Sequence, residues 1–341
     1  MASTSAAPAS FFTDHARKDL IRKLWCKPLI KALSDTLKKK LIYIGLPDIE
    51  ALDVLEWIDY LDKVIAFQCS SYKKGEVIDV AKLDDLLQKL ERQDKIKSGF
   101  VYQGWMEDIV MGGLSERGQT YAQNDFLKIY NLDFCSNILV PRQVLNEQGK
   151  VIKYITKLDV IDKFLEYELV ASNDGKGEKF IMYITVNTNS FDEDLSAIKD
   201  ACIKKYLKKI SAIKKPEVLA VRHLKAYCYS MLSERFRKYD FHVEFLPPVF
   251  YHGSSYPNRD TGKLLPHRMM TFTILGTRRK DAEQLYVQDC EKFLNDKFIF
   301  ATDKVISCFN DEKYITENDY DPDIQKIIAE SYSSKTLWSR A

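Results

Sequence analysis

The sequence has 341 residues, which is enough for one large α/β domain with helical additions or for two modest domains. Its 45% hydrophobic and 29% charged residues are ordinary for a globular protein, so disorder does not describe the whole chain. The formal net charge of +2 does not by itself indicate a nucleic-acid or membrane partner.

The cysteines are scattered, and none lies in a CxxC or Cys/His pattern with the spacing of metal ligands. A scattered, odd set is typical of a reducing compartment. The first residues contain no apolar core of signal-peptide length, and no run of about 18 apolar residues occurs. We therefore expect a cytoplasmic protein with no structural metal and no membrane partner.

Hydrophobic spacing predicts one or two amphipathic helices with basic outer faces over residues 11–39. Residues 40–47 are a short apolar run closed by glycine and proline, which is typical of a buried strand that ends in a turn. The alternation of buried strands and amphipathic helices then continues. Further strands are predicted at 63–68, 99–104, 125–134 and 179–187, and helices at 49–61, 81–93, 156–167 and 219–236.

The C-terminal part of the pattern is different. Two predicted strands, 241–248 and 269–276, are joined by a Gly-, Pro- and Ser-rich loop over 254–266 instead of a helix, which predicts an antiparallel pair. A helical pattern returns at 282–294, followed by a polar tail that is acidic over 310–323. The expected fold is α/β, with a doubly wound, mostly parallel seven-stranded sheet, a terminal antiparallel hairpin, and N- and C-terminal helices.

This order of elements resembles the class I S-adenosylmethionine-dependent methyltransferase fold. We assign residues 1–39 to an N-terminal helical extension, 40–279 to the methyltransferase-like α/β domain, and 280–341 to a C-terminal helical extension and tail. The resemblance implies S-adenosylmethionine as cofactor, bound where ligands of doubly wound sheets bind, at the carboxyl ends of the strands. Four turns at those ends carry the candidate residues.

The first turn, residues 45–50, stands where the family has a glycine-rich turn that lets the backbone approach the cofactor. By resemblance, Gly45, Pro47 and Asp48 would contact the cofactor. The turn has a single glycine and is not GxGxxG, so a nicotinamide cofactor is only weakly indicated. The alternative is an ordinary turn in which Asp48 caps the following helix.

The second and third turns follow the next two strands. Gln68 stands where the family places an acidic residue for the ribose hydroxyls, and its amide retains one acceptor oxygen. After the third predicted strand, the resemblance implies that Glu107 or Asp108 bonds an adenine amino group and that Trp105 or Met106 lines the face of the adenine. The alternatives are a polar residue at a strand end and a capped helix start with a core tryptophan.

The fourth turn is the tetrad Asn131-Leu-Asp-Phe134. It resembles the tetrad of amino-methyltransferases, in which a polar residue holds the target amine and an aromatic ring stacks on it. Leu132 and Asp133 stand in place of two prolines. The resemblance implies that Asn131 and Asp133 orient a nucleic-acid amine for direct attack on the cofactor methyl, with Phe134 stacked on the base. The alternative is that Asp133 caps the next turn.

His252 and His267 flank the 254–266 loop, which also carries Arg259 and Lys263. This loop either contacts phosphate or a partner, or it is an exposed polar hairpin. Two main functions stay open: methylation of a nucleic-acid amine, and a catalytically degenerate methyltransferase-fold subunit of a larger nucleic-acid-processing or defence complex. A third is another nucleotide-handling enzyme. The partners considered are nucleic acid, a protein partner and a second copy of the chain.

Overall fold

The computed structural model describes residues 15–69, 78–121, 129–134, 138, 141–145, 148, 150–173, 179–188, 195, 198–214, 216–257, 264–278, 290–296, 298–302 and 306–309. The acidic stretch 310–323, the loop residues Arg259 and Lys263, and residues 282–289 of the last predicted helix lie outside these ranges. Within them, no helix is both long and apolar enough to cross a membrane.

The chain begins with a helical run of three parts: α1 (His15–Leu20), a π-helix (Ile21–Cys26) and α2 (Lys27–Leu37). Pro28 has no N–H to donate, so the ordinary helical ladder is interrupted where the π-helix passes into α2. Trp25, Leu29 and Leu33 are buried on one side of the run. The Trp25 indole donates a 2.9 Å hydrogen bond to the Thr273 hydroxyl, which fastens the run to the central sheet.

Five strands form the parallel half of that sheet, in the order β3-β2-β1-β4-β7. Adjacent strands pair in parallel throughout this half. The order reverses between β1 and β4, so the sheet is doubly wound, as expected. These strands are β1 (Leu41–Gly45), β2 (Leu61–Gln68), β3 (Ser98–Gln103), β4 (Ile129–Asp133) and β7 (Lys179–Asn187).

The antiparallel part begins with β10 (Leu264–Arg278), which pairs with β7. On the other side of β10, β8 (Phe241–Phe245) and β9 (Val249–Pro257) follow one another along the same edge. Pro247 and Pro248 separate them because proline cannot donate to a ladder. The predicted antiparallel pair is thus confirmed, while β9 extends into the segment expected as loop.

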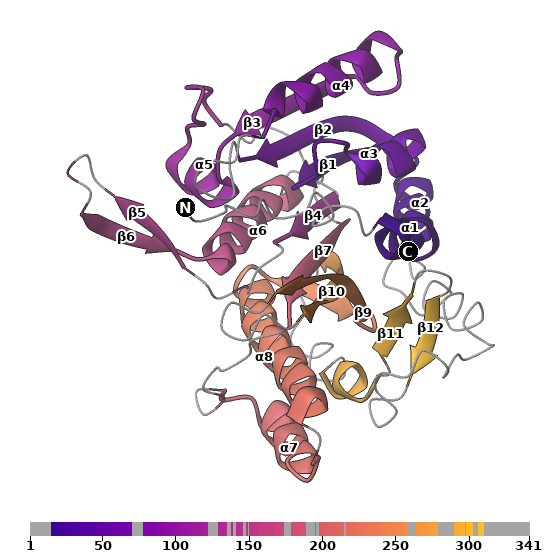
Figure 1. Ribbon diagram of the computed structural model, residues 1–341, viewed down its shortest axis with the longest axis vertical. Coiled ribbons are helices and arrows are strands. Elements are labelled where there is room, and N and C mark those ends of the chain that lie inside the picture. The colour runs from indigo at the N-terminus through magenta and orange to yellow at the C-terminus, as the bar shows by residue number, and fades with distance from the viewer. Residues whose placement is uncertain are drawn as a thin grey trace, which may run out of the picture.

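Within the described ranges the sheet has ten strands, where seven were expected. Besides β9, the additional strands are β11 (Phe298–Ala301), parallel to β9, and β12 (Ile306–Phe309), antiparallel to β11. Both come from the region expected to be helical, where the described helical segment is 290–295. A separate two-stranded hairpin, β5 (Arg142–Leu145) and β6 (Val151–Ile155), projects from the body (Figure 1).

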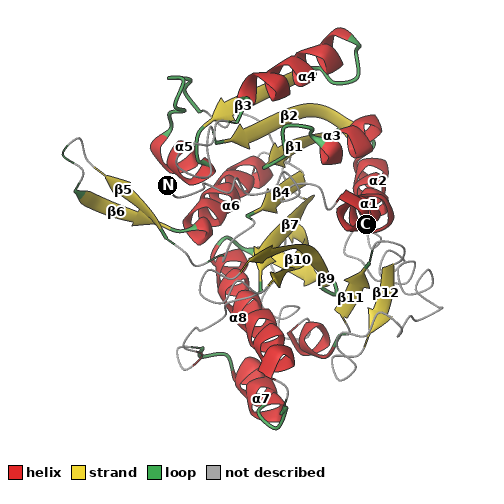
Figure 2. Ribbon diagram, in the orientation of Figure 1, coloured by secondary structure: helices red, strands yellow, loops and turns green. Residues whose placement is uncertain are grey.

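Helices cover both faces of the sheet (Figure 2). The N-terminal run, α3 (Leu52–Trp57) with the 3₁₀ turn Ile58–Tyr60, and α4 (Val80–Arg92) contribute to one core. On the opposite face, α5 (Met106–Gly112), α6 (Lys157–Asn173), α7 (Ala201–Ile210) and α8 (Pro216–Lys238) contribute to a second core rich in aromatic side chains. The crossovers therefore change face between β3 and β4, which places a topological switch point between β1 and β4.

Candidate functional site

The carboxyl ends of the parallel strands lie side by side along one edge of the sheet, here called the rim. Gly45 at the end of β1 is in register with Ala66 of β2 and Asn131 of β4. Gln68 is in register with Gln103 at the end of β3. Asp133, at the end of β4, is in register with Thr185 of β7. The structure thus brings all four predicted turns to this edge.

Three polar side chains bind one another at the switch point and are here called the switch-point triad: Tyr43 of β1, Asp53 of α3 and Asn131 of β4. The Tyr43 hydroxyl donates to Asp53 Oδ2 at 2.5 Å, and Asn131 Nδ2 donates to the same oxygen at 2.5 Å. Tyr43 is fully buried and Asp53 is 4% exposed. Burial, together with the Asp53 carboxylate, raises the pKa of Tyr43, so its hydroxyl stays protonated as a donor.

Gly45 is required by the packing of these groups. A Cβ atom at this position would collide with the backbone carbonyl oxygen of Asn131 and would lie 2.9 Å from the Tyr43 hydroxyl. The missing side chain therefore makes room for the neighbouring strand and for the triad. A role of Gly45 in cofactor binding stays a prediction.

Backbone N–H groups hold the rest of the first turn in place. Leu46 N–H donates to the Asn131 carbonyl at 3.0 Å, and Asp48 Oδ1 accepts from Ile49 N–H at 2.6 Å. The residue before α3 is Ala51, in the left-handed region at φ 44°, and no side chain caps the helix. The alternative that Asp48 caps α3 is therefore wrong. Pro47 is buried in the same turn.

Gln68 lies 3% exposed at the end of β2. Its backbone carbonyl accepts from Gly104 N–H at 3.0 Å, and its side-chain Nε2 is 3.5 Å from the Cys69 carbonyl. Gly104 has a φ of 131°, a conformation that favours glycine, and it turns the chain from β3 into α5. This turn delivers Trp105 and Glu107 to the rim.

Glu107 faces a buried lysine. Its Oε1 lies 4.0 Å from Lys157 Nζ at the start of α6, and both residues are 7% exposed. The same ammonium lies 5.5 Å from the centroid of the buried Phe134 ring. Burial lowers the pKa of Lys157, and the Glu107 carboxylate opposes this effect. Phe134, predicted to stack on a base, thus packs beside a cation of the chain itself.

Trp105 and Asp108 are engaged by Arg142 of the β5–β6 hairpin. The Arg142 guanidinium carbon lies 4.6 Å from the centroid of the Trp105 ring, and its Nε donates to Asp108 Oδ2 at 2.6 Å. A planar guanidinium suits this combination of stacking and hydrogen bonding. The predicted adenine-binding region is therefore the place where the hairpin is fastened to α5.

The N-terminal helix α1 reaches the rim from the face of the sheet opposite to α5 and α6. Lys18 Nζ forms a 2.8 Å ion pair with Asp133, and Arg17 donates to the backbone carbonyl of His252 in β9. Burial, with Arg268 and Arg17 nearby, lowers the pKa of His252 to about 4. Asp133, predicted to orient a target amine, is thus paired with an ammonium of the same chain.

The groups that bind the predicted site residues were not predicted from the sequence. Lys18, Lys157 and Arg142 lie far along the chain from the residues they bind, and no local motif marks them. The one usable signal was Asp53, a carboxylate in the first turn of a helix that directly follows a candidate turn.

A scan against protein-family models finds no match. A search of curated proteins finds no relative. Solved structures do show similarity. The YcgJ protein of Bacillus subtilis aligns over 78% of this chain and 99% of its own, with 8% identity and a TM-score of 0.33. An rRNA methylase from Streptococcus thermophilus aligns over 74% and 94%, with 12% identity and a TM-score of 0.31. A putative methyltransferase from Bacillus halodurans aligns over 74% of this chain and 99% of its own, with 10% identity and a TM-score of 0.32.

Similarity at this level says nothing about activity or substrate, so the assignment of the fold rests on the strand order. Five parallel strands run 3-2-1-4-5, and the long antiparallel strand β10 lies between the fifth of them and β8. This insertion gives the terminal hairpin that the resemblance implied. The chain therefore has the Rossmann-like fold of the class I methyltransferases.

Proposed function

We propose that this chain is a catalytically degenerate methyltransferase-fold protein that acts as a binding subunit of a larger assembly. The observation that carries the proposal is the switch-point triad. Ligands of doubly wound sheets bind at the switch point, using polar groups at the strand ends. Here Asn131 donates to Asp53, which also accepts from Tyr43, and the Tyr43 hydroxyl occupies the space beside Gly45.

The other predicted contacts support the same conclusion. Asp133 is paired with Lys18, Glu107 faces Lys157, and Trp105 lies under Arg142. A cofactor that used these groups would have to break internal pairs, and removing one partner of a buried pair costs free energy that ligand binding must supply. The turn after β1 has one glycine, and that glycine is needed for packing.

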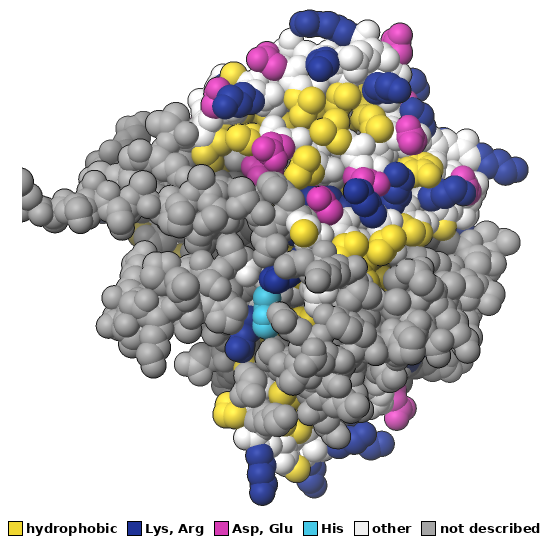
Figure 3. Space-filling model, turned by 45° about the vertical axis from the view of Figure 1, so that its right-hand side comes forward, with side chains coloured by type: hydrophobic (Ala, Val, Ile, Leu, Met, Phe, Trp, Pro, Cys, Tyr) yellow, Lys and Arg dark blue, Asp and Glu magenta, His cyan; other side chains and the backbone are white. Residues whose placement is uncertain are grey.

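The β5–β6 hairpin supports a protein partner. Val151, Ile152 and Tyr154 of β6 are exposed, although large apolar side chains are usually buried. An isolated two-stranded hairpin is at best marginally stable, so contact with another protein would stabilise it. Nucleic acid is less favoured, because acidic and basic side chains are intermingled over the described part of the face in Figure 3 and the net charge is only +2.

A second candidate is S-adenosylmethionine-dependent methylation of a nucleic-acid amine. The observation in its favour is the partial exposure of the Lys18–Asp133 pair, whose side chains are 33% and 21% exposed. Such a pair is worth at most about 1 kcal/mol and can open. Movement of α1 would then separate Lys18 from Asp133 at the rim.

Thermal unfolding with S-adenosylmethionine and S-adenosylhomocysteine tests the proposal. We expect no rise in Tm with either ligand at millimolar concentration and no transfer of labelled methyl groups to RNA or DNA. Saturation at 100 times the dissociation constant would add about 2.7 kcal/mol to stability, and that result would overturn the proposal. The variant Lys18→Ala is tested in parallel. Binding of S-adenosylmethionine by this variant, but not by the original chain, would support the second candidate function.

A further inference from the structure

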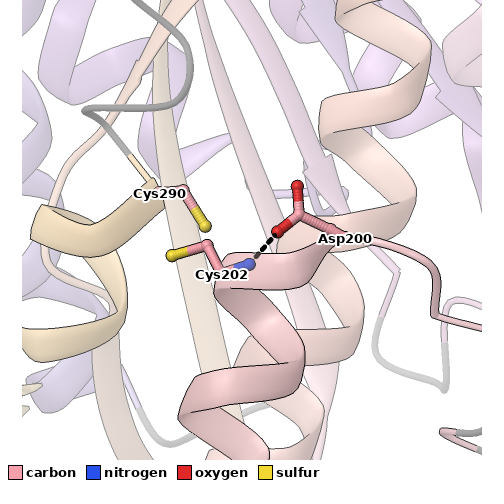
Figure 4. Close-up of side chains that lie close together, drawn as sticks. All are labelled: Asp200, Cys202 and Cys290. Atoms are coloured by element: carbon pink, nitrogen blue, oxygen red, sulfur yellow. Dashed lines mark hydrogen bonds between the residues drawn. The ribbon is translucent and has the colours of Figure 1, made fainter.

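Two cysteines and one aspartate meet at the second core. The ligand atoms of Asp200, Cys202 and Cys290 all lie within 4.8 Å of one another. Figure 4 shows the two sulfur atoms close together between the start of α7 and the described helical segment 290–295, with the Asp200 carboxylate beside them. Sequence spacing could not reveal this cluster, because Cys290 lies on a separate segment.

The start of α7 holds two of the three groups. Asp200 caps the ten-residue helix α7 by accepting from Cys202 N–H at 2.8 Å and from Ile203 N–H at 3.0 Å. Cys202 therefore lies in the first turn of α7, where the helix dipole stabilises a thiolate.

We propose that Asp200, Cys202 and Cys290 form a binding site for a thiophilic divalent cation, with Zn²⁺ as the ordinary case. Two thiolates and a carboxylate are common zinc ligands, and water would complete a tetrahedral site. Zinc–sulfur bonds of about 2.3 Å and zinc–oxygen bonds of about 2.0–2.2 Å require ligand atoms roughly 3.5–4 Å apart. The observed cluster already approaches that spacing, so small side-chain shifts suffice.

The cation would fasten the C-terminal segment to the core. Phe293, one turn after Cys290, stacks on Tyr229 at 5.1 Å between ring centroids and contacts Phe245 at the same distance. The segment then leads into β11, which joins the edge of the sheet. A cation held between α7 and Cys290 would thus stabilise the path from the second core to this edge. This role is independent of the function proposed for the rim.

The test is a titration of the full, metal-free chain with Co²⁺ and then Zn²⁺, in the presence of a phosphine reductant. We expect one Co²⁺ per chain, with the visible bands of tetrahedral coordination and a near-ultraviolet sulfur-to-cobalt band, both removed by Zn²⁺. Cys202→Ser and Cys290→Ser should each weaken Zn²⁺ binding at least about tenfold. Cys69→Ser, which changes a buried thiol outside the cluster, should bind like the original chain.

Asp200→Asn keeps the proposal testable if the cysteine variants do not fold, because asparagine also caps helices. This variant should fold, as judged by its circular dichroism, and bind Zn²⁺ more weakly. A Co²⁺ spectrum without sulfur bands would overturn the proposal. So would Asp200→Asn and Cys202→Ser variants that bind Zn²⁺ like the original chain, or thiols that form a Cys202–Cys290 disulfide once the reductant is removed but bind no metal while reduced.

Discussion

The side-chain amide of Asn131 donates a hydrogen bond to the carboxylate of Asp53, with 2.5 Å between Nδ2 and Oδ2. This bond joins β4 to α3 across the end of β1, and Tyr43 adds a second donor to the same oxygen. The buried Tyr43 and Asp53 and the partly buried Asn131 thus satisfy one another at the point where related sheets bind ligands. A ligand that used Asn131 would have to compete with an internal carboxylate.

Replacement of Asp53 by alanine should therefore destabilise the protein. The change leaves the Tyr43 hydroxyl and the Asn131 amide without their shared acceptor, and each buried unpaired group costs about 1–3 kcal/mol. Urea unfolding should show a lower free energy of unfolding with an unchanged slope. The control is Asp59→Ala, an exposed aspartate in the following turn, which should change the free energy by less than about 0.5 kcal/mol. Equal effects of the two variants would contradict a structural role for the triad.

The fold was largely predictable, because hydrophobic periodicity reports burial along each element. The strand 179–187 and the helix 81–93 were predicted to within a residue or two of β7 and α4. The strands β11 and β12 were missed because each is only four residues long. Their burial depends on the neighbouring strand β9, so the local pattern is too short to distinguish them from loop.

The site was predictable only in part. The carboxyl-end rule identified Gly45, Gln68, Glu107 and Asp133, and register brings their strand ends together. The groups that bind these residues come from other parts of the chain, as Lys18 does for Asp133. A single sequence contains no local signal for such pairs. Only the structure shows that the rim residues are paired with other side chains of the chain.

Glu107→Gln should destabilise the protein at neutral pH because it leaves the buried Lys157 ammonium without its carboxylate. Breaking a buried pair in this way costs roughly 3 kcal/mol. Burial already lowers the pKa of Lys157 from its ordinary 10.5, and loss of Glu107 lowers it further. Between the folded-state pKa and 10.5, the unfolded chain binds more protons at this lysine, so its contribution to stability rises with pH.

The deficit of Glu107→Gln relative to the original chain should therefore shrink as the pH is raised from 7 to 9.5. Urea unfolding at several pH values measures it. Glu234→Gln, at an exposed position of α8, is the control and should show no pH-dependent deficit. A deficit that stays constant over this range would mean that Lys157 does not lose its proton in the folded variant.

Arg142→Ala should release the β5–β6 hairpin from α5 without unfolding the sheet. The variant loses the bonds to Asp108 and the stacking on Trp105. We expect faster amide exchange and faster proteolysis within the hairpin, with a Tm within a few degrees of the original. Arg142→Lys keeps the charge but loses the planar contact, so its rates of exchange and proteolysis should lie between those of the original chain and Arg142→Ala. Unchanged exchange in Arg142→Ala would show that other contacts hold the hairpin.

Exposed apolar side chains on β6 should mediate assembly. Ile152 is 64% exposed and Tyr154 is 57% exposed. The double variant Ile152→Ser, Tyr154→Ser should keep the original Tm, because these side chains bury little surface in the single chain. Sedimentation at increasing protein concentration should show weaker self-association or weaker partner binding than the original. The control Lys153→Ser lies between them in the same strand. An equal loss of association in the control would assign the effect to charge instead of apolar contact.

His252 should make the protein less stable in acid. Its pKa is about 4 in the folded state because of burial, Arg268 and Arg17, against an ordinary value of 6.5. Between pH 6.5 and 4 the unfolded chain binds more protons at this position, so the contribution of His252 to stability is complete above pH 6.5 and is lost as the pH falls toward 4. His252→Asn removes the group and should lose less stability than the original between pH 7 and 4.5.

Arg17→Gln removes one nearby cation, so NMR titration of the His252 imidazole should give a higher pKa in that variant. An imidazole that titrates near 6.5 in the original chain would contradict the burial of His252 beside Arg268 and Arg17.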